Sequence, residues 1–162
     1  MIRETNVYDR EDLLHLFACQ GHEDQRYAGV NESFENLYRG WRRRGLTTRF
    51  EGEIFHVVDE RDGEIVGICG MSISTDGQTS MGELTAMYVK PEYRRKGIAL
   101  GLMKKVLELA RKKGVEFIFA WTRHEAIAAK ALYEKAGYEE NVQPVYYKIV
   151  DETKPAKPEQ AG

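Results

Sequence analysis

A strand that runs into a basic, glycine-containing loop and then a helix is the feature that most constrains this chain. Residues 83–89, Glu-Leu-Thr-Ala-Met-Tyr-Val, alternate and are rich in β-formers, and Pro91, which cannot donate to a ladder, ends the expected strand. Beyond the loop, apolar residues recur at helical spacing, at Ala99, Leu102, Met103, Val106, Leu109 and Ala110. Gly97 is therefore expected at the N-terminus of this helix.

The start of that helix has the chemistry of an anion site. The first N–H groups of a helix have no partner within it, and the positive end of the helix dipole faces outward. Gly97 lacks a Cβ and lets a diphosphate approach the main chain, while Arg94, Arg95 and Lys96 add positive charge. The pattern predicts a bound nucleotide-like cofactor, and the alternative is a solvated basic turn.

Two segments carry a family resemblance. Residues 94–99, Arg-Arg-Lys-Gly-Ile-Ala, match Q/R-x-x-G-x-G/A, and residues 129–138, Ala-Lys-Ala-Leu-Tyr-Glu-Lys-Ala-Gly-Tyr, resemble A-x-x-L-Y-x-x-x-G-F. Both segments resemble the GNAT superfamily of N-acetyltransferases, in which the first motif binds the pyrophosphate of acetyl-CoA. The resemblance covers residues 53–149 well, and residues 1–52 only in layout.

The resemblance implies an α/β fold of GNAT type, a mixed central sheet of about six to seven strands flanked by about four helices. Its fourth and fifth strands are expected to splay apart and admit the cofactor. The cosubstrate it implies is acetyl-CoA (coenzyme A), with no metal. By resemblance, the main chain at Met87, Tyr88 and Val89 lines the cofactor arm, and Arg94, Arg95, Lys96, Gly97, Ile98 and Ala99 hold its pyrophosphate.

Length and pattern predict one domain over residues 1–150, because 162 residues are too few for two comfortable domains. Asp9 and Asn31 are expected to cap the first two helices, and Asp62-Gly63 to form a tight hairpin turn. Residues 151–162 are expected to be a disordered tail. The other expected strands are 2–7, 54–58, 64–71, 115–121, one around Tyr138 and 145–150, and the other helices are 10–20, 31–45 and 125–136.

Composition argues against several classes of protein. A net charge of −2 argues against a protein that coats nucleic acid. The chain has no apolar run of membrane-spanning length and no signal-peptide pattern, so we expect a cytoplasmic protein without membrane contact. Cys19 and Cys69 lack metal-site or disulfide spacing, and both are interpreted as small buried residues. A homodimer is compatible with all of this.

Tyr133 is the candidate acid. Acetyl transfer to an amine ends with a thiolate that leaves faster when it is protonated, and a phenol with a pKa near 10 carries its proton at neutral pH. Tyr133 matches the tyrosine of the family's helix motif, and Ala126 and Ala129 lie on the same helix line. The family often has Asn where this chain has Ala126, so that polar contact is expected either to be missing or to come from Thr122 or His124. The alternative role of Tyr133 is a packed aromatic.

Glu83 is the candidate base, because it begins the fourth expected strand where several relatives carry a carboxylate that acts directly or through water. Strand alternation places it on one face with Thr85 and Met87, unless a bulge intervenes. A solvated charge at a strand end is an equal alternative. His56 and His124 are lesser candidates by chemistry alone.

The acceptor is expected to be a small-molecule or amino-acid-like amine, with a protein N-terminus or lysine second. The region that forms the acceptor wall in the family holds carboxylates and aromatics suited to a cation, namely Glu23, Asp24, Tyr27, Glu32, Glu35, Tyr38 and Trp41. For Glu32 and Glu35 we prefer the alternative that they complement the dipole in the first turn of a helix. A noncatalytic acyl-CoA sensor is the alternative of a different class. A nucleotide-phosphate binder is disfavoured, because the chain lacks G-x-x-x-x-G-K-S/T and G-x-G-x-x-G.

Overall fold

A mixed sheet with strand order β1-β2-β3-β4-β5 forms the centre of the computed structural model, which describes residues 1–45, 52–75, 77–123 and 125–141. The strands are β1 (Ile2–Glu4), β2 (Glu53–Arg61), β3 (Glu64–Thr75), β4 (Ser80–Val89) and β5 (Phe117–Phe119). Neighbours from β1 to β4 pair antiparallel, and β5 pairs with β4 in parallel. The architecture is the α/β arrangement that the sequence predicts.

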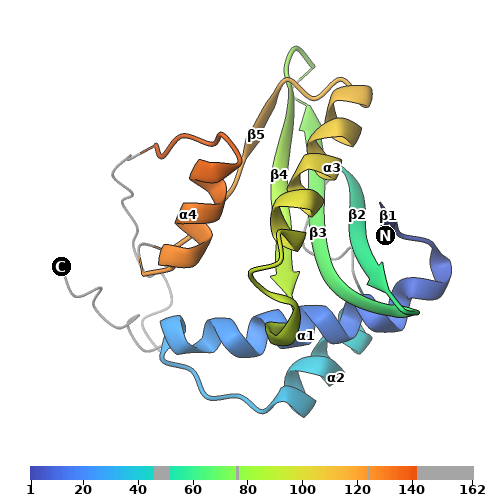
Figure 1. Ribbon diagram of the computed structural model, residues 1–162, viewed down its shortest axis with the longest axis vertical. Coiled ribbons are helices and arrows are strands. Elements are labelled where there is room, and N and C mark those ends of the chain that lie inside the picture. The colour runs from blue at the N-terminus through green and yellow to red at the C-terminus, as the bar shows by residue number, and fades with distance from the viewer. Residues whose placement is uncertain (46–51, 76, 124, 142–162) are drawn as a thin grey trace.

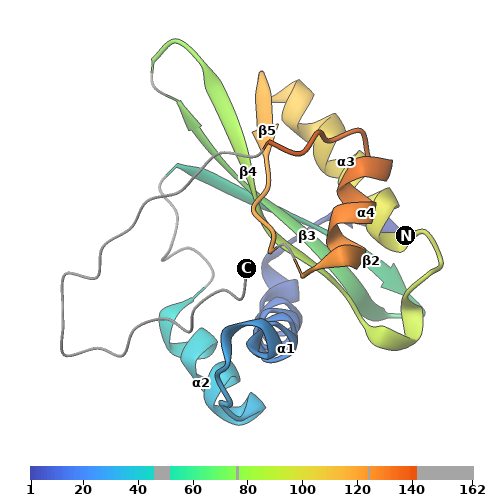
Figure 2. The same ribbon diagram turned by 90° about the vertical axis from the view of Figure 1, so that its left-hand side faces the viewer.

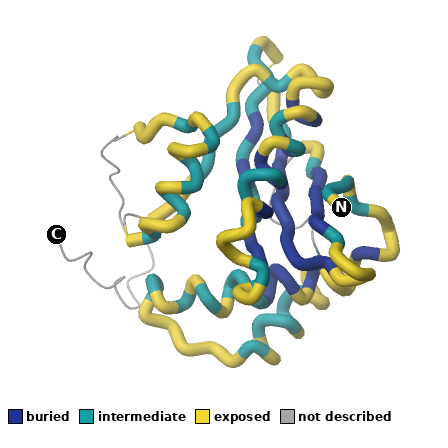
Figure 3. The backbone as a smooth tube through the Cα atoms, in the orientation of Figure 1, coloured by how far each residue is buried: buried dark blue, intermediate teal, exposed yellow. Residues whose placement is uncertain are grey.

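Two helices cover each face of the sheet (Figures 1 and 2). They are α1 (Arg10–Ala28) and α2 (Phe34–Arg44) on one face, and α3 (Ile98–Lys112) and α4 (Ile127–Lys135) on the other. Leu13, Leu16 and Phe17 of α1 pack on one face, and Leu102 and Val106 of α3 on the other. Figure 3 shows the central strands as the most buried part of the chain. The two faces therefore have separate apolar cores.

A bulge at Thr85 divides β4 into two halves. Ala86 pairs with Gly70 and Leu84 pairs with Met71, so Thr85 has no partner in β3. Leu84 consequently packs in the core under α3, whereas Ala86 packs in the core under α1. The extra residue reverses the alternation, so Glu83 and Met87 lie on opposite faces instead of sharing one.

Helix α1 is longer than predicted and ends at Gly29, where φ is +64°. The sequence predicts a helix only over residues 10–20, but the polar stretch that follows lacks a breaker other than Gly21, whose cost of about 1 kcal/mol is tolerated within a long helix. The C-terminal half of α1 has no helical spacing of apolar residues, because this half does not cover the core.

The helix caps also differ from the predicted ones. Ser33, not Asn31, caps α2, because the Asn36 N–H donates to Ser33 Oγ at 3.3 Å. The Asp9 side chain does not cap α1. It accepts hydrogen bonds from Arg3 at 2.7 and 2.9 Å and from the Asn6 N–H at 2.7 Å.

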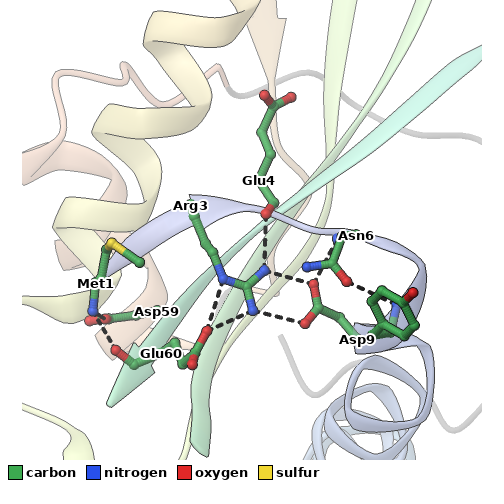
Figure 4. A network of polar contacts seen from close by, with 8 residues as sticks. Met1, Arg3, Glu4, Asn6, Asp9, Asp59 and Glu60 are labelled. Atoms are coloured by element: carbon green, nitrogen blue, oxygen red, sulfur yellow. Dashed lines mark hydrogen bonds and ion pairs between the residues drawn. The ribbon is translucent and has the colours of Figure 1, made fainter. Parts of the chain in front are cut away.

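A polar network joins β1, β2 and the start of α1 (Figure 4). Arg3 binds Asp9 and also donates to Glu60 at 2.7 and 2.9 Å. The hydrogen bonds from Arg3 lower the pKa of Asp9, because they favour its charged form. Asp59 is fully buried and accepts from Arg61 and from the Met1 amine. The network fastens the short first strand to the sheet.

The β2–β3 connection is the predicted tight turn, with φ of +51° at Asp62 and +80° at Gly63. Among the described residues no strand forms around Tyr138, contrary to the prediction. The Tyr138 N–H instead donates to the Tyr133 carbonyl and the Gly137 N–H to Glu134, so this segment closes α4 as a Schellman motif. The described residues therefore form five strands rather than six to seven, and the expected strand 145–150 lies outside them.

Strand β5 is shorter and less buried than predicted. Only residues 117–119 of the expected 115–121 pair as a strand, and Phe117 and Trp121 are 63% and 74% exposed. Among the described residues β5 is the last strand of the sheet, which leaves these rings uncovered. Cys69 is buried as expected, whereas Cys19 is only half-buried.

Candidate active site

Strands β4 and β5 diverge immediately after Glu83. They pair at Met81–Phe117, Gly82–Ile118 and Glu83–Phe119, and the rest of β4 then has only β3 as its neighbour among the described strands. After Phe119 the chain leads away to α4 (Figures 1 and 2). The splay expected between strands four and five is confirmed.

The main chain of β4 offers hydrogen-bonding groups to this gap. The Lys90 N–H donates to the Val66 carbonyl at 2.9 Å, so Lys90 turns its main chain toward β3. Strand alternation then directs the N–H and C=O of Val89 and Met87 toward the gap and those of Tyr88 toward β3. An extended ligand arm with amides has matching groups at Met87 and at the N–H of Val89, whose carbonyl already accepts from Arg94 Nε.

The loop after β4 forms a cradle at the start of α3. Arg95 and Gly97 adopt left-handed conformations, with φ of +63° and +77°, and no side chain caps the helix. A Cβ at Gly97 would meet nothing within 4 Å, so the space above it is open. Arg95 and Lys96 are exposed beside it. The loop residues therefore fit the diphosphate of acetyl-CoA, with Gly97, Ile98 and Ala99 supplying unpaired N–H groups.

Arg94 differs from the other two cations of the loop, because its guanidinium is held by a distant helix. Lys96 has partners within its own turn, since its Nζ donates to the Glu92 carbonyl at 3.0 Å and lies over the Tyr93 ring. The Arg94 Nη2 donates to both carboxylate oxygens of Glu23 at 2.7 and 2.8 Å, and the Arg94 Nε donates to the Val89 carbonyl at 2.8 Å. The guanidinium also lies over the Tyr88 ring, 5.4 Å from its centroid. These contacts direct Arg94 toward α1.

Tyr133 lies on α4 and packs against the core under α3, with its ring centroid 5.8 Å from that of Tyr138. Burial raises its pKa, and the charges of Cys69 and Asp24 add to the rise. Its hydroxyl therefore keeps its proton at neutral pH. A protonated hydroxyl on this face of the gap has the chemistry that a departing thiolate needs.

Glu83 lies on the other face of the sheet, at the point where β4 and β5 separate. It is half-buried and stands opposite Ser72, which is 6% exposed, in the β3–β4 ladder. The bulge at Thr85 is what places Glu83 and the Met87 side chain on different faces. A carboxylate and Tyr133 thus border the gap from opposite sides of the sheet.

His56 shares the face of Glu83. Its ring packs edge-on against that of Phe17, with the two ring centroids 5.6 Å apart. Burial lowers the pKa of His56 to about 4, so the imidazole is neutral at ordinary pH. The hydroxyl of Thr85 is buried on this face and has no hydrogen-bond partner among the described residues. The sequence names His56 as a lesser candidate base but does not bring it together with Thr85. The signal for their proximity is Gly70, which leaves room for both side chains. His124 lies outside the described residues.

The expected acceptor wall separates into two groups. Tyr38 donates to Glu11 and Trp41 packs on Phe17, so these aromatics attach α2 to α1. Glu23, Asp24 and Tyr27 instead belong to the half of α1 that approaches the gap, where the Arg123 Nη1 donates to the Tyr27 carbonyl at 3.3 Å. Burial and the charge of Glu23 raise the pKa of Asp24.

The position expected to support the cofactor arm before α4 has no polar side chain. Ala126 occupies the N-cap of α4 and makes no side-chain hydrogen bond. Of the two substitutes that the sequence indicates, Thr122 is exposed and His124 is not described. Thr122 is therefore the substitute that the structure leaves accessible.

The profile of the acetyltransferase (GNAT) family matches residues 13–138. The chain belongs to the GNAT family. It is 28% identical over 142 residues to an uncharacterized N-acetyltransferase of Methanocaldococcus jannaschii, a match that covers 86% of this chain and 60% of that protein. It is 30% identical over 82 residues to a putative ribosomal-protein bS18-alanine N-acetyltransferase of Bacillus subtilis, covering 51% of this chain and 52% of that protein.

The aligned region of this GNAT chain thus spans between half and two thirds of those curated relatives. A solved aminoglycoside acetyltransferase from an uncultured soil metagenomic sample has a TM-score of 0.65 at 22% identity, covering 92% of this chain and 97% of that one. At that identity the likeness establishes the GNAT fold alone. No helix of the described ranges is long and apolar enough to cross a membrane.

Proposed function

We propose that the chain is an N-acetyltransferase that moves the acetyl group of acetyl-CoA directly to a primary amine in a ternary complex. The observation that carries the proposal is the open cradle at Gly97 beside the β4–β5 gap, with Tyr133 and Glu83 on its two sides. Acetyl-CoA supplies an activated acetyl thioester when it is bound.

Different residues of the chain bind the cofactor, remove a proton from the acceptor and protonate the leaving group. The N–H groups at Gly97, Ile98 and Ala99, with Arg95 and Lys96, hold the pyrophosphate, and the β4 main chain at Met87 and Val89 aligns the arm. Glu83 takes a proton from the acceptor ammonium, directly or through water, and the neutral amine then attacks the thioester carbonyl to form the C–N bond as the C–S bond breaks. Tyr133 gives its hydroxyl proton to the sulfur that leaves.

The acceptor we favour is a small-molecule or amino-acid-like amine. The carboxylates of Glu83 and Asp24 approach the gap from the sheet and from α1, and both suit a cation. A solved protein of similar fold is named as an aminoglycoside acetyltransferase, which supports this class.

A protein N-terminus is the second candidate acceptor. It is favoured by the sequence similarity to the putative ribosomal-protein alanine N-acetyltransferase and by the exposed rings of Phe117 and Trp121 at β5. Such rings can contact a peptide that enters beside the sheet edge.

The test is a panel of amines assayed with acetyl-CoA, followed by release of free thiol. The panel contains small primary amines, an aminoglycoside, and peptides with a free N-terminus or a lysine. We expect the small amines to give the fastest release. Release with peptides alone would select the second acceptor class, and binding of acetyl-CoA without release for any amine would identify a noncatalytic sensor.

A further inference from the structure

We propose that the C-terminal half of α1 braces the mouth of the β4–β5 gap, and that Glu23 is a positioning residue that acts through Arg94 on the cofactor loop. The inference rests on the proposed acetyl-CoA site. It assigns to α1 a role in preparing that site before the cofactor arrives.

The brace has one contact at each side of the gap. On the β4 side, Glu23 accepts two hydrogen bonds from Arg94, the first residue of the loop. On the β5 side, the Tyr27 carbonyl accepts from Arg123, which follows the strand. Glu23 and Tyr27 are four residues apart and therefore lie on the same side of α1. One helix side thus joins two segments that the sheet leaves unpaired.

The Glu23 contact is better fixed than an ordinary surface ion pair. Both carboxylate oxygens are engaged at 2.7 and 2.8 Å, and the Glu23 and Arg94 side chains are only 32% and 38% exposed. Arg94 is held further by the Val89 carbonyl and by the face of Tyr88. Four contacts from two elements, α1 and β4, restrict the guanidinium to one arrangement.

This arrangement acts on the cradle through the backbone. Arg94 Nε binds the carbonyl of Val89, the last residue of β4, so the side chain spans the turn from the strand to the loop. The main-chain N–H groups that receive a diphosphate follow within the next residues. Fixing Arg94 reduces the conformational freedom that the loop would lose on binding. Glu23 is therefore expected to improve acetyl-CoA affinity although its own charge is negative.

The experiment is a double-mutant cycle on acetyl-CoA affinity, measured by calorimetry. Glu23→Ala is expected to weaken binding about 5-fold, as for the loss of a half-buried charged hydrogen bond. Arg94→Ala should weaken it at least as much, and the double variant no further than Arg94→Ala alone, because Glu23 acts through Arg94. Glu11→Ala is the matched control, since Glu11 is an α1 carboxylate whose contacts are with Arg10, Tyr38 and Arg42.

Two further readouts separate positioning from other effects. Hydrogen exchange of residues 94–99 in the ligand-free protein should accelerate in Glu23→Ala and not in Glu11→Ala. In Glu23→Ala the KM for acetyl-CoA should rise by a larger factor than kcat falls, whereas Glu11→Ala should change neither.

Unchanged or tighter binding by Glu23→Ala would overturn the proposal, since Glu23 would then be neutral or a competitor of the diphosphate. Additive losses in the cycle would also overturn it. If the wild type does not bind acetyl-CoA, the proposed function fails, and the exchange measurement still decides whether Glu23 holds the loop.

Discussion

His56 of β2 and Thr85 of β4 lean over Gly70 from the two strands that flank β3. A Cβ at Gly70 would lie 2.7 Å from His56 Cδ2 and 2.8 Å from Thr85 Oγ1, distances that packed atoms do not adopt. The missing side chain is thus what lets an imidazole and a hydroxyl occupy the face that carries Glu83.

Gly70→Ala should therefore destabilise the fold by about 1–3 kcal/mol, the usual cost of overpacking a core. Urea unfolding measures the change. Gly21→Ala is the control, because a Cβ there meets nothing within 4 Å and the residue lies inside α1, where Ala is favoured. Equal stabilities of the two variants would contradict the contact described at Gly70.

The burial of His56 predicts a specific pH dependence of stability. Its folded pKa of about 4 lies below the ordinary histidine pKa of 6.5, so the unfolded chain binds the proton first as pH falls. The free energy of unfolding should be unaffected by His56 above pH 6.5 and should fall between pH 6.5 and 4, by on the order of 3 kcal/mol. In His56→Gln the free energy of unfolding should change less steeply with pH between pH 4 and 6.5. A slope equal to that of the wild type would assign the titration to other groups.

Gly97→Val should greatly weaken acetyl-CoA binding. Gly97 has a φ of +77°, which a β-branched residue resists, and the valine side chain would fill the open space that a diphosphate needs. Lys112→Ala, at the other end of α3, should bind acetyl-CoA like the wild type. Calorimetry compares the two, with circular dichroism to verify folding, and similar losses would argue against the cradle.

Tyr133→Phe should retain acetyl-CoA affinity and lose turnover by about 10²-fold, the low end for removal of a general acid. The ring that packs beside Tyr138 remains, and only the hydroxyl is removed. Single-turnover rates with saturating substrates measure the chemical step. An unchanged rate would reduce Tyr133 to a packed aromatic.

Glu83→Gln should slow the acetylation of strongly basic amines, which arrive protonated because their reference pKa is about 10. Weakly basic amines are already neutral and should be affected less. The ratio of kcat/KM values for the two amine classes is the measurement. An equal loss for both classes would indicate a positional role, and no loss for either would leave Glu83 as a solvated strand end.

Local sequence signals predicted the parts of the site that depend on neighbours along the chain. Pro91 and Gly97 place the loop between β4 and α3, and Asp62-Gly63 makes its hairpin turn without outside help. Gly137 likewise ends α4 four residues after Tyr133. In each case the backbone preference of one or two residues determines the local conformation.

Tertiary structure decided which faces these parts present and which distant residues they meet. The bulge at Thr85 arises from pairing with β3, and it alone puts Glu83 and the Met87 side chain on opposite faces. The partner of Arg94 is Glu23, 71 residues away, on a helix segment whose polar sequence gives no apolar period. Strand register and long-range ion pairs depend on how two cores pack around one sheet, and no local propensity encodes that choice.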